Sequence, residues 1–100
     1  MESRIQRMPW ESAERIAVSG LAFIAGETES LGRFLAETGL GPENLRSAAG
    51  EPWFLCAVLE FLMANEDLLL VFVERIRVRP TMIAAAHLAL SEDGGDVTIN

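Results

Sequence analysis

A self-similarity at an offset of 38 residues constrains the fold of this 100-residue chain more than any other feature. Residues 21–49 align with residues 59–87 without a gap. The identical matched pairs are Leu21 with Leu59, Phe23 with Phe61, Leu31 with Leu69, Phe34 with Phe72, Pro42 with Pro80 and Ala48 with Ala86. A helical chain rich in Ala and Leu can also align with itself by chance. Matched Phe and Pro positions are harder to obtain from composition alone, so the pattern favours two tandem copies.

The first helix of each copy is marked by apolar residues at helical spacing. In copy one (about residues 11–49) this spacing runs from about Glu11 to Ala25, and Gly26 is expected to end the helix. In copy two (about residues 50–90) the helix is expected to begin at Pro52, because proline is preorganised for the first helical position.

Capping and turn signals divide the rest of each copy into a second and a third helix. The second helices are expected to begin after Glu27 or Thr28, and after Asn65, because Thr and Asn are good N-terminal caps. Short third helices are expected to begin at Pro42 and Pro80. Each copy is therefore predicted to be a trihelical unit.

The predicted fold class is all-α, because no segment alternates apolar and polar residues for long enough to indicate a strand. We expect one compact bundle of about five to six helices, built from the two tandem copies, over residues 9–90. Residues 1–8 and 91–100 have turn chemistry and no helical period, so they are predicted to be flexible tails.

Composition and charge narrow the function classes. Half of the residues are hydrophobic, which indicates a chain that folds. The net charge is -7, and such a charge repels nucleic acid and anionic membrane surfaces. A single cysteine, no signal-peptide pattern and no apolar segment of membrane-spanning length together indicate a cytoplasmic protein.

The candidate catalytic and metal-binding residues are few and isolated. His87 is the sole histidine, and no second His or Cys is available to complete a transition-metal site with it. Cys56 has apolar neighbours, which predicts an inert core cysteine. Glu92, Asp93 and Asp96 lack the ligand spacing of a calcium loop. We therefore expect no enzyme activity, no metal and no cofactor.

Two segments carry a resemblance to a known family. They are "GRFLAETGL" at residues 32–40 and "FLMANEDLL" at residues 61–69. Over residues 12–90 the chain resembles a family of short bacterial proteins that is known only as a domain of unknown function. The resemblance implies a small all-helical bacterial protein, and it implies no activity.

The differences between the copies are more informative about function than the matches. Four polar or small residues of the second helix in copy one are replaced in copy two by Leu68, Leu70, Val71 and Ile76. The segment "LLLVFV" is therefore apolar around its whole circumference and must be covered on all sides. We expect Leu68 and Ile76 to face the interior of the monomer, and Leu70 and Val71 to face another chain.

The local basic cluster "ERIRVRP" contains Arg75, Arg77 and Arg79. These residues are expected to cap the negative end of the preceding helix, or alternatively to contact a phosphate or an acidic peptide. The leading hypothesis is a noncatalytic protein-interaction module, either a homodimer or an adaptor. The alternative is a small nucleic-acid regulator of the helix-turn-helix type, and an enzyme is the third hypothesis.

Overall fold

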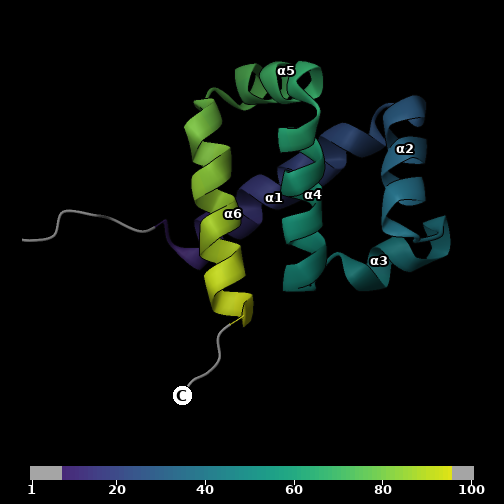
Figure 1. Ribbon diagram of the computed structural model, residues 1–100, viewed down its shortest axis with the longest axis horizontal. Helices are drawn as coiled ribbons and strands as arrows, with labels where there is room; N and C mark the ends of the chain where they lie inside the picture. The colour runs from purple at the N-terminus through teal and green to yellow at the C-terminus, as the bar shows by residue number, and fades with distance from the viewer. Residues whose placement is uncertain (1–7, 96–100) are drawn as a thin grey trace, which may run out of the picture.

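The computed structural model describes residues 8–95, and over this range the chain is helical, with no strand (Figure 1). The elements are α1 (Trp10–Ala25), α2 (Thr28–Thr38), the 3-10 turn η1 (Pro42–Asn44), α3 (Leu45–Ala48), α4 (Pro52–Ala64), α5 (Glu66–Ile76) and α6 (Pro80–Gly95). The prediction of an all-α fold of about five to six helices is confirmed, and the described range has six α-helices.

The ends of the helices follow the predicted positions, since α2 begins after Glu27 and α5 after Asn65, but the two side-chain caps expected there do not form. Gly26 ends α1 and Pro52 begins α4, as predicted. The predicted side-chain caps are wrong, because Thr28 is already inside α2 and Asn65 forms no capping hydrogen bond to α5. The Asn65 amide instead donates back to the carbonyl of Phe61 in α4. The Asn65 side-chain oxygen, which would have to accept from α5 in order to cap it, accepts instead from the Arg33 guanidinium of α2.

The last helix is longer than the sequence pattern predicted. α6 begins at Pro80 as expected but continues to Gly95, beyond the predicted boundary at residue 90. The extension follows from packing, because Leu90 is fully buried and the Ser91 hydroxyl lies 3.5 Å from the Cys56 sulfur on α4. Met8, at the edge of the other predicted tail, packs against the core. The remaining predicted tail residues, 1–7 and 96–100, lie outside the described range.

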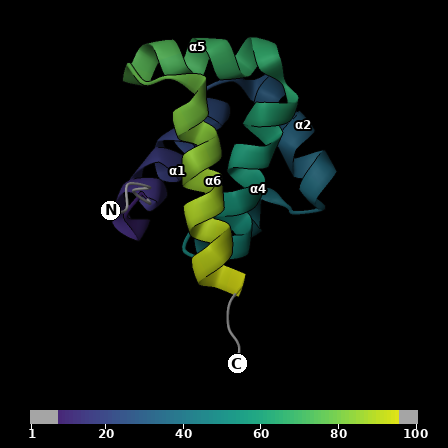
Figure 2. The same ribbon diagram turned by 60° about the vertical axis from the view of Figure 1, so that its left-hand side comes forward.

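The core is arranged around α4, which contributes six buried side chains. α6 packs along both α4 and α1, while α2 and α5 close two sides of this central group (Figures 1 and 2). Phe34 of α2 makes edge-to-face contacts with Phe54 and Phe61 of α4. On the other side, Phe72 of α5 contacts Phe23 of α1, with 5.4 Å between ring centroids. Aromatic contacts therefore hold both outer helices to the centre.

The two halves of the chain correspond in part. α2 and α5 have eleven residues each, and their bounds are separated by the 38-residue offset at both ends. The following elements begin at the matched prolines, but α3 has four residues and α6 has sixteen. In contrast to the short α3, α6 packs against both α1 and α4 at the centre of the molecule. The six-helix fold is established, and the tandem repeat stays a prediction.

Candidate protein interface

The two candidate catalytic residues, His87 and Cys56, each make a side-chain contact between α4 and α6. The His87 ring nitrogen Nε2 lies 2.7 Å from the Glu60 carboxylate, so the pair connects α6 to α4. Cys56 is a free, partly buried cysteine next to Ser91. Residues 8–95 contain no group of three or more His, Cys, Asp or Glu side chains that could hold a metal ion. Asp96, from the rejected calcium pattern, is outside the described range.

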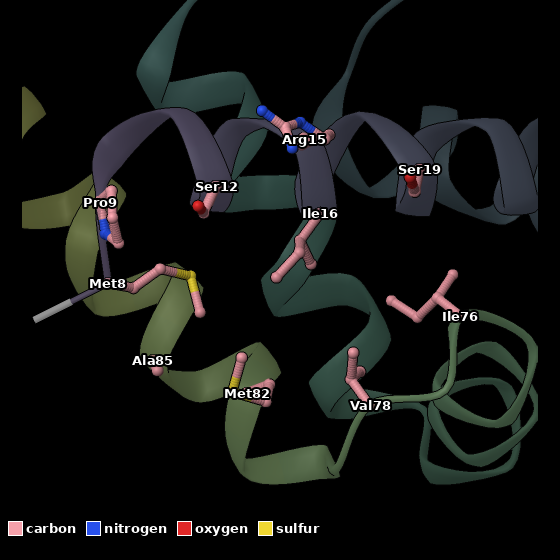
Figure 3. A pocket seen from close by; sticks show the side chains of 10 residues that line it. All are labelled: Met8, Pro9, Ser12, Arg15, Ile16, Ser19, Ile76, Val78, Met82 and Ala85. Carbon is pink, nitrogen blue, oxygen red and sulfur yellow. The ribbon is translucent and has the colours of Figure 1, made fainter.

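A groove between α1 and α6 has a volume of about 510 Å³. Figure 3 shows the side chains of Ile16, Met82 and Val78 pointing into the same space from three different segments. The apolar lining residues are Met8, Pro9, Ile16, Ile76, Val78, Met82 and Ala85, and the polar ones are Ser12, Arg15 and Ser19. We call this hollow the α1–α6 groove.

The groove exists because small residues face each other where the helices cross. Ser12 and Ser19 flank Ile16 on one side of α1, and Ala85 is the facing residue of α6. None of these three small side chains can fill the space between the helices. The connection from α5 to α6 closes one end with Ile76 and Val78.

Arginines lie next to this apolar surface. Arg15 lines the groove, while Arg75, at the end of α5, and Arg77 and Arg79, in the α5–α6 connection, are exposed sequence neighbours of the lining residues Ile76 and Val78. The Arg75 guanidinium lies over the Phe23 ring, 5.2 Å from the centroid, which anchors it beside α1. We call these four arginines the basic rim. They are half of the eight basic residues in a chain of net charge -7, and none of the ten described lining residues is acidic.

The side of α5 that faces away from the core has the opposite character. Leu70 and Val71 are 49 % and 46 % exposed, and Glu66, Asp67 and Glu74 lie exposed beside them at helical spacing, while Arg75 of the basic rim follows one turn after Val71. We call the two apolar and three acidic residues the outer face of α5, and Figure 2 shows this helix lying across the ends of its neighbours. Elsewhere on the same helix, Leu68 and Ile76 are partly buried against the core.

Residues 10–93 match the family model described as a protein of unknown function, DUF3572. The chain belongs to this family. No curated protein and no solved structure is significantly similar to it. The DUF3572 region extends from the beginning of α1 almost to the end of α6, so it includes nearly the whole lining of the groove.

In this DUF3572 protein, sequence reasoning identified only part of the site. Ile76 and the three arginines of the α5–α6 connection were singled out, whereas Ile16, Met82 and Arg15 were not. No local signal could have found them, because the groove depends on α6 crossing α1. Over the described range, no single helix is long and apolar enough to cross a membrane. Within residues 8–95, the pair Pro42–Ala48 and Pro52–Ala64 taken together reaches that length and composition, with a bend of 117° between them.

Proposed function

We propose that this protein is a noncatalytic interaction module that binds an acidic, amphipathic helix of a protein partner in the α1–α6 groove. The observation that carries the proposal is an apolar groove that Arg15 lines, with three further arginines next to its lining residues in the chain, on an otherwise acidic protein. Grooves of this kind take helices whose apolar residues recur at i, i+3, i+4 and i+7. Methionines suit such a surface, because their flexible side chains adapt to the shape of the partner, and Met8 and Met82 both line this one.

The dimensions of the groove support a helix as the ligand. Its lining residues in α1 run from Ser12 to Ser19, which is about 10 Å at the rise of an α-helix. That length corresponds to about two helical turns, enough for apolar residues from two successive turns of the partner. The Met82 side chain is 38 % exposed in the groove. An apolar side chain of the partner that covered it would remove this apolar surface from water, which favours binding.

The charge of the groove selects the type of helix. Arginine presents a planar fork of donors that matches carboxylates, and the basic rim offers four of them. Nucleic acid also carries negative charge, but the net charge of -7 repels an extended polyanion. A short acidic segment is attracted mainly by the nearby arginines, because salt screens its repulsion from acidic residues farther away than about 8–10 Å.

The experiment measures binding of two designed peptides by fluorescence anisotropy. Both are amphipathic helices with the same leucines, and their flanking residues are glutamate in one and lysine in the other. We expect the glutamate peptide to bind at least about tenfold more tightly. Equal binding of both peptides, or binding of neither, would contradict the proposal.

Two variants on α6 locate the binding surface. Met82→Glu places a negative charge in the groove, and Leu88→Glu is the matched control, because Leu88 is 53 % exposed on the same helix and is not a lining residue. We expect Met82→Glu to weaken binding of the glutamate peptide at least about tenfold and Leu88→Glu to leave it within about twofold. The same loss in both variants would show a general charge effect and would remove the groove from the proposal.

We also propose that the two halves are tandem copies, with the outer face of α5 as the place where copy two acquired a new surface. The shared bounds of α2 and α5 support this proposal. Gly32 and Arg33 in copy one correspond to Leu70 and Val71 in copy two. Superposition of residues 21–41 on residues 59–79 in a crystal structure tests it, and divergent paths of the matched helices would contradict it.

A further inference from the structure

We infer that the helix bound in the α1–α6 groove is α5 of a second copy of this chain, presented through its outer face. This inference rests on the proposed function of the groove. The outer face of α5 has the chemistry that the groove selects: two large apolar side chains, half exposed, with three carboxylates beside them. The protein therefore has both halves of a helix-in-groove contact on its own surface.

Charge complementarity favours this pairing over any other contact between two copies. Each copy has a net charge of -7, so two copies repel each other in most orientations. The basic rim is a local concentration of positive charge, and Glu66, Asp67 and Glu74 are negative charges around an exposed apolar pair. Docking one onto the other brings opposite charges together, and it covers Leu70 and Val71 at the same time.

The position of the two surfaces favours a closed dimer. Ile76, at the end of α5, lines the groove, so groove and outer face belong to neighbouring parts of one molecule (Figure 3). In a two-fold dimer each copy then contributes its groove to the partner's α5 and its α5 to the partner's groove. The contact is made twice, and neither groove is left open for a third copy.

Sedimentation of the full chain tests the dimer directly. We expect dimers at about 100 µM, a concentration at which even weak specific pairs associate, and dissociation as the salt concentration rises. Leu70→Glu with Val71→Arg removes the apolar face, and Met82→Glu blocks the groove. Each variant alone is expected to be a folded monomer. Val18→Glu is the control, because Val18 is 46 % exposed but lies outside both surfaces, and this variant is expected to stay dimeric.

Mixing the variants gives the decisive measurement. The Leu70→Glu/Val71→Arg chain retains an open groove, and the Met82→Glu chain retains an intact outer face of α5. Their mixture is expected to form a heterodimer through one of the two contacts, although each chain alone is a monomer. The inference would be overturned if the mixture formed no heterodimer at about 100 µM. It would also be overturned if the Met82→Glu variant alone still formed dimers. If the double variant does not fold, Leu70→Gln with Val71→Gln takes its place.

The peptide experiment distinguishes this failure from failure of the proposed function. The monomeric Leu70→Glu/Val71→Arg variant has a free groove, so it is expected to bind the glutamate peptide at least as tightly as the parent. A monomeric parent that binds this peptide would overturn the self-association and leave the groove function in place. A dimeric parent whose monomeric variant binds no peptide would overturn the groove function itself, and with it this inference.

Discussion

Gly39 and Arg77, which are 38 residues apart, end α2 and α5 in the same left-handed backbone conformation, with φ of 79° and 61°. The backbone N–H of each donates to the carbonyl four residues earlier, Leu35 or Val73. The two helices therefore share this left-handed end, although the next N–H donates to Thr38 Oγ1 in one half and to the Val73 carbonyl in the other. Glycine adopts it without steric cost, whereas the Cβ of arginine conflicts with the backbone there.

This difference predicts opposite effects of substitution at the two positions. Gly39→Ala is expected to lower the free energy of unfolding by about 1 kcal/mol, because alanine acquires the steric conflict. Arg77→Gly is expected to raise it by about 0.5 kcal/mol, because relief of about 1–2 kcal/mol is partly offset by the greater entropy of glycine in the unfolded chain. Urea unfolding measures both, with Gly50→Ala, which has open space around it, as the control. A loss of stability in Arg77→Gly would contradict this account of the turn.

Gly20 lies at the close contact between α1 and α4. A Cβ at this position would lie 3.0 Å from Leu62 Cδ1 and 3.3 Å from Val58 Cγ1, both in the buried core. Gly20→Val is therefore expected to cost about 1–3 kcal/mol of stability through overpacking. Gly32→Val is the matched control in α2, where no atom lies within 4 Å of the added Cβ, and it is expected to change stability by less than about 0.5 kcal/mol. Thermal unfolding checks the pair, and equal effects would show that helix propensity alone decides at both sites.

Phe34 attaches α2 to the centre of the molecule. It is fully buried, and its ring centroid lies 5.6 Å from that of Phe54 and 5.4 Å from that of Phe61. Phe34→Ala is expected to cost about 3–5 kcal/mol, a large part of the 5–15 kcal/mol typical of a folded domain. Leu88→Ala on the exposed surface should change stability by less than about 0.5 kcal/mol. Guanidinium unfolding followed by circular dichroism measures both, and a loss below about 1 kcal/mol at Phe34 would contradict the packing.

The net charge of -7 predicts no binding to random duplex DNA. At about 150 mM salt the parent is expected to leave a labelled duplex free at tens of micromolar, where ordinary nonspecific binders reach dissociation constants of about 1–100 µM. Anisotropy of the duplex measures this, and the same titration at low salt is the control for weak electrostatic contact. An affinity in the ordinary nonspecific range would restore the helix-turn-helix hypothesis.

The amino-acid sequence alone determined the helices and much of their burial. Gly26, Pro52 and Pro80 act on the backbone within one turn, so the ends that they produce could be predicted. Phe34 and Phe72 are buried where the 38-residue comparison matched them. Comparison of the copies also singled out Leu70 and Val71, which the described structure leaves about half exposed.

Only the tertiary structure decided how these helices meet. The Asn65 side chain does not cap α5, because its amide donates to the Phe61 carbonyl and its oxygen accepts from Arg33, which α2 brings beside it. The groove brings Ile16 together with Met82, and the basic rim brings Arg15 together with the α5–α6 connection. Residues so far apart along the chain have no local preference for one another. They meet because burial of the faces of α1, α4 and α6 sets the crossing of the helices, and that crossing leaves a space where small side chains coincide.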